Sequence, residues 1–261
     1  MDFKPSYDVD DFRRIIELLR SENGCPWDRE QTHESIRRNF LEEAYEVCEA
    51  IDEKDTVHLK EELGDVLMQV LFHSRIEEEA GHFDINDVAD GACKKLIHRH
   101  PHVFGNTEAC DSKTVLENWD EIKRRERSQE TVASVMTGVS KSLPSLWRSE
   151  KVQKKAAKVG FDWPDISGAL AKVDEELGEL REAVETGVGT CEELGDLLFA
   201  VVNAARFLDI DPETALHGTC EKFIRRFDFV ETEAHKRGLC LEKMSLDEME
   251  ELYQLGKKTE R

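Results

Sequence analysis

The sequence predicts an all-α protein that contains two tandem copies of one helical-bundle domain, and three observations support this fold class. Charged residues make up 36% of the chain and aromatic residues only 7%, a balance typical of helices with solvated surfaces. The 6 prolines and 15 glycines are few for 261 residues, which also favours helices. Finally, a charged heptapeptide occurs twice, as Glu-Glu-Leu-Gly-Asp-Val-Leu at 61–67 and as Glu-Glu-Leu-Gly-Asp-Leu-Leu at 192–198.

Further matches to this repeat follow in the same order in both halves. Residues 41–46 correspond to residues 174–179, and residues 92–99 correspond to residues 219–226. Two copies indicate a duplicated domain, not a solenoid array, and we expect the copies at 1–130 and 146–261. The segment 131–145 loses the dense charge and gains small residues and a proline, so a linker is expected there.

Apolar residues within each half recur at intervals of three and four, which is the period of an amphipathic helix. This pattern runs from Leu59 to Leu71 in the first half and from Leu194 to Val202 in the second. No strand-like alternation extends beyond a few residues. We therefore expect four or five helices per half, packed as a bundle.

Glycines and capping patterns mark expected helix boundaries. Three glycines are expected to end helices, and two pairs have the spacing of an N-terminal capping box. The glycines are Gly81, Gly160 and Gly238, and the pairs are Thr190 with Glu193 and Ser245 with Glu248.

Charge and cysteine content limit the partners and the compartment. The chain has 36 basic and 57 acidic residues and a formal net charge of −21, which disfavours nucleic-acid polymers as partners. A phosphate ligand would need imported cations, most simply divalent metal. The odd set of 7 cysteines without a C-x-x-C pair, and a first segment without an apolar stretch, predict a cytoplasmic protein. The longest apolar run, 197–202, is too short for a membrane span.

Each half carries two acidic pairs at positions i and i+3 of its expected helices. A spacing of three places both side chains on one helix face, so two antiparallel helices would bring four carboxylates together. A single pair is weak evidence, because an exposed like-charge pair costs only about 0.2–0.5 kcal/mol. Glu193 could also serve only as the third residue of the Thr190 capping box. The first set is Glu43, Glu46, Glu62 and Asp65, and the second is Glu176, Glu179, Glu193 and Asp196.

Convergence of such a set requires neutralising cations. Two carboxylates about 5 Å apart repel by about 3 kcal/mol at an effective dielectric constant of 20. Oxygen-only donors suit Mg²⁺ or Mn²⁺ better than Zn²⁺. A ferritin-like di-iron site would need Glu-x-x-His pairs, and only Glu30 with His33 and Glu79 with His82 have that spacing, the second pair interrupted by Gly81. The sequence therefore favours Mg²⁺, with Mn²⁺ as an alternative.

Two smaller features have competing interpretations. The run His98, His100 and His102 could bind a transition metal, but Pro101 within it favours the end of a helix. Trp27 and Trp163 are expected to anchor the core and not to stack on a base. There is no G-x-x-x-x-G-K phosphate loop.

Together with the paired E-x-x-E and E-x-x-D helices, four phrases resemble the MazG family of nucleoside triphosphate pyrophosphohydrolases. They occupy residues 23–28, 99–104, 160–163 and 221–227, and the resemblance covers nearly the whole chain. It implies an all-α fold, a homodimer formed through the helical domains, and Mg²⁺-dependent hydrolysis of nucleoside triphosphates to monophosphate and pyrophosphate.

Carried over by position, the resemblance also implies site residues. The second carboxylate set would ligate metal and, with Lys222 and Arg226, form the catalytic group. A nucleotide would lie beside Lys172, Glu192, Asn203, Lys222, Arg225, Arg226 and Tyr253. The family pattern has tryptophan where this chain has Tyr253, which keeps an aromatic ring for stacking.

The two copies differ at positions that could contact a nucleotide. Asn203 corresponds to Phe72 and Arg225 corresponds to His98. An amide can hydrogen-bond a sugar or base, whereas a phenyl ring cannot. We therefore expect the second copy to be the main catalytic domain and the first set to be a second candidate metal site.

The leading interpretation is an enzyme that hydrolyses NTPs and dNTPs with broad base tolerance, through attack of a metal-activated water at the α–β phosphate linkage. A narrower dUTP or dCTP pyrophosphohydrolase is one alternative. A non-catalytic, nucleotide-sensing regulatory dimer is the other. The expected partners are nucleoside triphosphates and a second copy of the chain, without nucleic-acid polymer or membrane.

Overall fold

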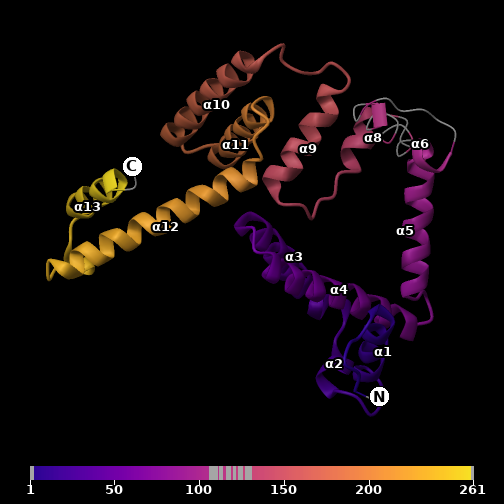
Figure 1. The fold of residues 1–261 in the computed structure, drawn as a ribbon. Coiled ribbons are helices and arrows are strands. Elements are labelled where there is room, and N and C mark those ends of the chain that lie inside the picture. The colour runs from indigo at the N-terminus through magenta and orange to yellow at the C-terminus, as the bar shows by residue number, and fades with distance from the viewer. Residues whose placement is uncertain are drawn as a thin grey trace. The chain divides into compact units, whose positions relative to one another are not determined.

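The computed structural model describes residues 3–105 and 131–259, together with residues 111, 114, 115, 119, 122 and 126. Helices account for the regular structure in these residues, and none of them lies in a strand (Figure 1). The all-α prediction is confirmed. The chain divides into two compact units, residues 1–123 and 124–261. Among the described residues, no helix is both long enough and apolar enough to cross a lipid bilayer.

The first unit is organised around a hairpin of two long helices, α3 and α4. Helix α1 packs against α4, and Ile16, Ile36, Leu71 and Phe72 form the buried core between the three helices. The helices of this unit are α1 (Val9–Leu19), α2 (Pro26–Glu30), α3 (His33–Glu53), α4 (Thr56–Glu79), α5 (Ile85–Arg99) and α6 (Pro101–Phe104).

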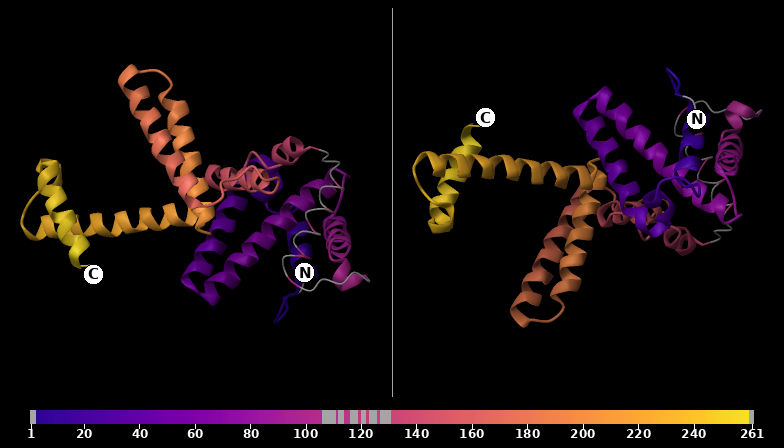
Figure 2. Two further views of the ribbon diagram at one scale, coloured as in Figure 1. Left: turned by 90° about the horizontal axis from the view of Figure 1, so that it is seen from above. Right: turned by 90° about the horizontal axis from the view of Figure 1, so that it is seen from below.

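A second hairpin, α10 with α11, is the centre of the second unit. Helix α9 packs against α11, and α13 folds back across the far part of the long helix α12 (Figure 2). Val230, Ala234 and Leu252 are the buried core of that α12–α13 contact. The elements are α8 (Val132–Thr137), α9 (Ser145–Ala157), α10 (Ile166–Thr186), α11 (Thr190–Phe207), α12 (Pro212–Lys236), the 3₁₀ turn η1 (Leu241–Lys243) and α13 (Leu246–Thr259).

Glycine ends helices where the sequence predicts it. Gly81, Gly160 and Gly238 follow α4, α9 and α12 with φ of 76°, 85° and 68°. This left-handed backbone conformation is strained for a residue with a Cβ and is open to glycine.

The two expected capping boxes have different outcomes. The box at Ser245 is confirmed: its backbone N–H donates to Glu248 Oε2 at 2.7 Å, and the Glu248 N–H donates to Ser245 Oγ at 3.3 Å. The box at Thr190 is wrong, because α11 begins at Thr190 itself and the N-cap is Gly189 in the left-handed conformation (φ 79°). The Glu193 carboxylate is therefore not used for capping.

Three further expectations can be compared with the structure. Helix α5 ends at Arg99 and His100 caps it, so the histidine run ends a helix as predicted. Trp27 and Trp163 are 63% and 46% exposed, so their assignment as core anchors is wrong. Trp27 lies in the short helix α2, before α3, and Trp163 lies in the segment before α10. The boundaries 1–130, 131–145 and 146–261 stay a prediction, and α8 lies within the expected linker.

Candidate metal and nucleotide site

Each hairpin positions one carboxylate set. Glu43 and Glu46 lie on α3 and the matching pair lies on α4, whereas α10 and α11 carry the second set. The connecting turns are short and use left-handed residues, Lys54 in the first hairpin and Gly187 with Gly189 in the second. Tight turns force the helices to pack antiparallel, which brings the acidic pairs of the two helices to face each other.

In the second hairpin, Glu176, Glu193 and Asp196 form a compact set. One carboxylate oxygen from each lies within 4.8 Å of the others. Glu176 is only 5% exposed, Glu193 is partly buried and Asp196 is open to solvent. Lys172, one turn before Glu176, places its Nζ 2.6 Å from Glu176 Oε1 and 2.8 Å from Glu175 Oε1.

Glu179 faces the same set from an exposed position on α10. The neighbouring charge of Glu176 is the largest cause of its raised pKa, followed by burial, a hydrogen bond with Glu176 and the charge of Glu193. Hydrogen bonds to Glu175 and Glu176 raise the pKa of Lys172, which keeps this lysine charged. The predicted convergence of the acidic pairs is thus present in the second hairpin.

The first hairpin repeats the arrangement with Glu43, Glu62 and Asp65, whose ligand atoms also lie within 4.8 Å of one another. Glu62 is 7% exposed, and its Oε1 lies 3.1 Å from Nε2 of His58. Burial, and then the charges of Asp65, Glu46 and Glu62, raise the pKa of Glu43. Burial and the charge of Glu46 raise the pKa of Glu62, so all four carboxylates interact.

Both sets fit a hard divalent cation. Their donors are carboxylate oxygens, as Mg²⁺ and Mn²⁺ prefer. Burial and neighbouring carboxylates raise the pKa of Glu43, and the charge of Glu176 is the main cause of the raised pKa of Glu179, so a bound cation would relieve repulsion between these groups. The residues present therefore suit a divalent metal, which an ordinary solvated helix face would not require.

The predicted nucleotide cations lie on a different helix from the carboxylates. Lys222, Arg225 and Arg226 are on α12, which packs against α13 and α9. The Arg226 Cζ lies 5.8 Å from the centre of the Tyr253 ring. Arg225 and Arg226 line a cleft of about 250 Å³ between α12 and α13. The structure thus groups Arg225 and Arg226 of α12 with Tyr253 of α13.

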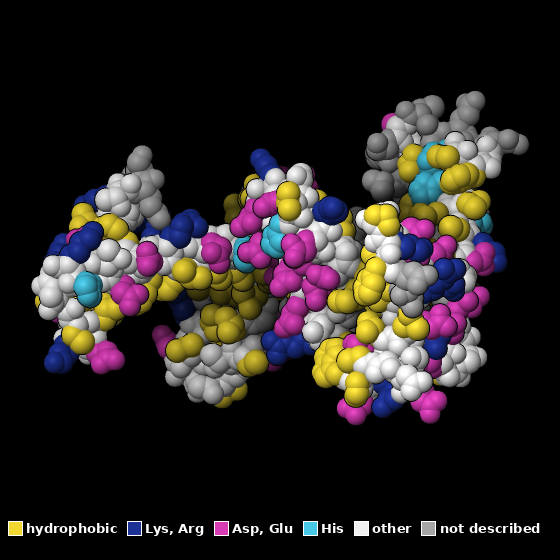
Figure 3. Space-filling model, turned by 60° about the horizontal axis from the view of Figure 1, so that its bottom comes forward, with side chains coloured by type: hydrophobic (Ala, Val, Ile, Leu, Met, Phe, Trp, Pro, Cys, Tyr) yellow, Lys and Arg dark blue, Asp and Glu magenta, His cyan; other side chains and the backbone are white. Residues whose placement is uncertain are grey.

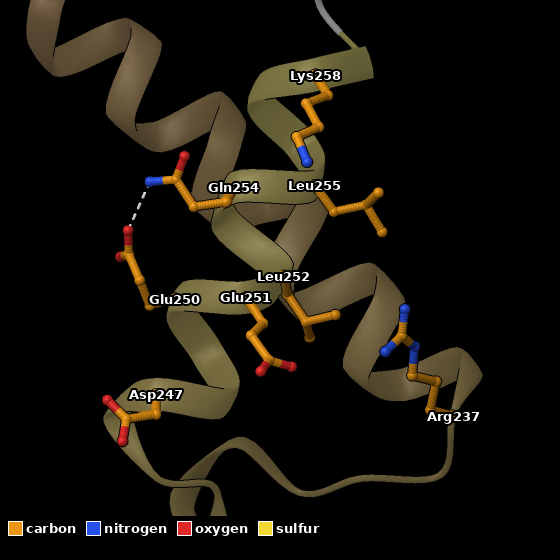
Figure 4. Close-up of a pocket in the computed structure, with 8 residues that line it drawn as sticks. All are labelled: Arg237, Asp247, Glu250, Glu251, Leu252, Gln254, Leu255 and Lys258. Carbon is orange, nitrogen blue, oxygen red and sulfur yellow. Dashed lines mark hydrogen bonds between the residues drawn. The ribbon is translucent and has the colours of Figure 1, made fainter.

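A larger cavity, of about 590 Å³, lies along α13 and is also lined by Arg237 at the end of α12 (Figure 4). Its lining mixes acidic, basic and apolar side chains, with Gln254 Nε2 donating to Glu250 Oε1 at 2.6 Å. Neither carboxylate set contributes to it. We therefore place the candidate site at the hairpins.

The remaining nucleotide candidates lie on α10 and α11. Lys172 pairs with Glu176 as described, and Glu192 is exposed in the first turn of α11. Asn203 accepts two hydrogen bonds from Arg206, which also pairs with Asp162. Sequence reasoning missed Asp162 and the role of Arg206. The sequence offers little indication of this role, because both copies have an arginine at this position, Arg206 and Arg75. The two copies differ three residues earlier, where the second has Asn203 and the first has Phe72.

Fold and site together define a class: an all-α protein in which two duplicated helical hairpins each present a carboxylate set suited to a divalent cation. The model of the MazG nucleotide pyrophosphohydrolase domain matches the chain twice, at residues 31–104 and 166–230. Each match contains one complete carboxylate set.

Curated relatives resemble the chain over most of its length. A nucleoside triphosphate pyrophosphohydrolase/pyrophosphatase MazG of Thermotoga maritima is 44% identical over 93% of this chain and 93% of its own length. A nucleoside triphosphate pyrophosphohydrolase of Escherichia coli K12 is 44% identical over 97% of this chain and 98% of its own length. YabN of Bacillus subtilis is 48% identical over 96% of this chain and 52% of its own length. The chain belongs to the MazG nucleotide pyrophosphohydrolase family.

Proposed function

We propose that this protein hydrolyses nucleoside triphosphates to the monophosphate and pyrophosphate with the help of Mg²⁺. The observation that carries the proposal is the set of Glu176, Glu193 and Asp196, three carboxylate oxygens within 4.8 Å beside a permanently charged lysine. The names of the relatives and the two family matches support the reaction class. The proposed substrates are NTPs and dNTPs with broad base tolerance.

The carboxylates of the set hold the cation, and they bind it more tightly because they repel one another without it. When bound, Mg²⁺ orients the phosphates, neutralises developing charge and lowers the pKa of the attacking water. Glu179, at the edge of the set and with a raised pKa, is suited to accept a proton from that water. Lys172 holds Glu176 in place through its ion pair of 2.6 Å.

The cations of α12 are proposed to bind phosphate oxygens, because a protein of net charge −21 has few other positive groups to offer a triphosphate. Lys222 and Arg226 would neutralise the leaving pyrophosphate. Tyr253, in contact with Arg226, would stack on the base or the sugar. Within one chain α12 packs against α13 and α9, so these contacts are proposed to form when α12 moves or when a second copy contributes it.

We further propose a homodimer as the working form. The hairpin and α12 of the second unit expose large apolar side chains, each about half exposed in the single chain, and hydrophobic side chains also reach the surface elsewhere (Figure 3). Helix faces of this kind are stable in water when a partner covers them. They include Leu194, Leu198, Val201, Phe223, Ile224 and Phe227. Light scattering on the purified protein would give twice the 30.0 kDa chain mass.

The second copy is proposed to do most of the chemistry and the first set to be a second metal site. The cysteine pattern supports the cytoplasm as the proposed compartment, because the six cysteines that the structure describes are free thiols: Cys25, Cys48, Cys93, Cys191, Cys220 and Cys240.

Product analysis tests the proposed function. The wild type and Glu193→Gln, a change that keeps shape and removes one ligand charge, are incubated with an NTP and dNTP panel and Mg²⁺. We expect monophosphate and pyrophosphate from the wild type alone. Orthophosphate as the first product would mean that another bond is cleaved, and no turnover of any substrate would favour a nucleotide-sensing dimer. Release confined to dUTP or dCTP would favour a narrower enzyme.

A further inference from the structure

A chain of side-chain contacts connects α11 to the segment before α10. Arg206 Nε and Nη2 donate to Asn203 Oδ1 at 3.1 and 2.9 Å, and Nη2 also donates to Asp162 Oδ1. The Arg206 side chain is only 12% exposed, and its Cζ lies 4.5 Å from the centre of the Phe207 ring. The guanidinium is therefore held on several sides and is not an ordinary surface charge.

These contacts fix the orientation of the Asn203 amide. A guanidinium has donors and no acceptor, so the atom that faces it must be the asparagine oxygen. The NH₂ group then points away from Arg206, and the described residues provide no hydrogen-bond acceptor for it. The Asn203 NH₂ group is a donor, so a group that pairs with it must be an acceptor.

Asp162 is itself held in place. Its Oδ1 accepts a second hydrogen bond, from the backbone N–H of Trp163 at 3.0 Å. The Trp163 ring lies so close to Gly168, in the first turn of α10, that a Cβ there would come within 2.8 Å of it. The segment that carries Asp162 is thus bound to α10 at one point and to α11 at another, which keeps Arg206 and Asn203 in a fixed orientation.

The position of Asn203 relative to the carboxylates matches the layout of a nucleotide. Asn203 lies seven residues after Asp196, which is two helical turns on the same face and about 10 Å along the axis. A substrate with its phosphates at Asp196 and its nucleoside along α11 would therefore reach Asn203.

The first copy lacks this arrangement although it keeps the arginine. The counterpart of Asn203 is Phe72, 7% exposed within the core. Arg75, the counterpart of Arg206, directs its guanidinium to Glu78 and Glu79, each at 3.0 Å. The oriented amide is therefore a property of the second copy alone.

From these contacts we propose that Asp162 and Arg206 are positioning residues that hold Asn203 as a dedicated donor to a carbonyl oxygen on the base. Uracil and guanine carry such an oxygen where cytosine and adenine carry an amino group. The second copy would then bind UTP better than CTP and GTP better than ATP, as a graded preference within broad tolerance. This inference rests on the proposed function, since it assumes that the phosphates lie at the carboxylate set.

The test measures binding apart from turnover. Calorimetry with the α,β-methylene analogues of UTP and CTP, in Mg²⁺, gives the affinity ratio for the full-length wild type, Asn203→Leu, Arg206→Met and Arg206→Lys. Arg75→Met is the matched control in the first copy. We expect about a tenfold preference for the UTP analogue in the wild type, the size of one hydrogen bond to an oriented donor. Asn203→Leu should reduce it to within about twofold, Arg206→Met should do nearly the same, and Arg206→Lys should restore part of it.

Two results would overturn the inference: a ratio that Asn203→Leu leaves unchanged, or a ratio that Arg75→Met lowers as much as Arg206→Met does. A melting temperature for each variant excludes loss of fold as the cause. Failure of the proposed function looks different, because the wild type would then release no pyrophosphate from any hydrolysable NTP. If the protein releases pyrophosphate but Asn203→Leu does not change the ratio of UTP-analogue to CTP-analogue affinity, only this inference fails and the proposed function stands.

Discussion

The two hairpins present the same carboxylate geometry and differ in the cation beside it. In the second, Lys172 lies 2.6 Å from Glu176, and its raised pKa keeps it charged at any working pH. The corresponding position in the first copy is Asn39, and His58 lies 3.1 Å from Glu62 of that set. A lysine supplies permanent charge, whereas a histidine supplies it only when protonated.

The copies also differ two helical turns after the aspartate of each set, on α4 and on α11. Phe72 is part of the buried core of the first unit, whereas Asn203 is partly exposed and held by Arg206. Both copies thus keep the carboxylate set, while one copy uses this helix for packing and the other uses it for polar contacts. We therefore expect the two copies to differ in activity, because an active site must also bind the rest of the substrate.

Substituting one carboxylate of each set should give the largest difference in activity between the two copies. Asp196→Ala should lower the rate of pyrophosphate release by about a hundredfold or more, because it removes a ligand of the active set. Asp65→Ala should leave much of the activity. Steady-state release from the same NTP measures both variants, and equal losses would contradict the ranking of the copies.

The cations of the two copies provide the next comparison. Lys222→Met should weaken turnover by about tenfold through the loss of a charge-assisted contact to phosphate. Lys95→Met, its counterpart on α5, should have little effect. The kcat and KM of each variant are compared with the wild type. A strong effect of Lys95→Met would mean that the first copy also binds substrate.

We expect both copies to bind metal, although we expect only the second copy to be active. Adding Mg²⁺ to metal-free protein should raise its melting temperature, because a ligand that binds only the folded state stabilises it. Glu62→Gln and Glu176→Gln should each remove about half of that rise. If Glu62→Gln left the Mg²⁺-induced rise intact, the first set would not be a metal site.

Much of this account could be read from the sequence because it depends on local spacing. The i, i+3 pairs, the short turns between helices and Gly81, Gly160 and Gly238 are all local, and the structure follows them. Apart from the local capping box at Thr190, the failures involve contacts distant in sequence. The pairing of Asp162 with Arg206 spans 44 positions and leaves no periodic trace. The exposure of Trp27 and Trp163 depends on how short segments lie against the hairpins, which residue type does not determine.

The smallest predicted effect concerns pH and the metal-free first set. The pKa of Glu43 is raised above its ordinary value of 4.5, so just above that pH the folded state binds more protons than the unfolded state and stability falls as pH rises. Without metal, Glu43→Gln should therefore be more stable than the wild type at pH 7.5, by about 2 °C in melting temperature. The advantage should shrink as the pH approaches 4.5.

Thermal scans in a metal chelator across this pH range check the prediction, with Glu49→Gln, an exposed site on the same helix, as control. Saturating Mg²⁺ should reverse the order of the wild type and Glu43→Gln. A stability difference independent of pH would show that crowding of the carboxylates is not its cause.

The central claim is that the second copy performs the hydrolysis while both copies keep the metal set. Neutralising one whole set at a time tests it most directly. One protein carries Glu43→Gln, Glu62→Gln and Asp65→Asn, and the other carries Glu176→Gln, Glu193→Gln and Asp196→Asn. Pyrophosphate release from the same NTP should persist in the first protein and vanish in the second. Activity that survives in the second protein, or disappears in the first while it remains folded, would contradict the account.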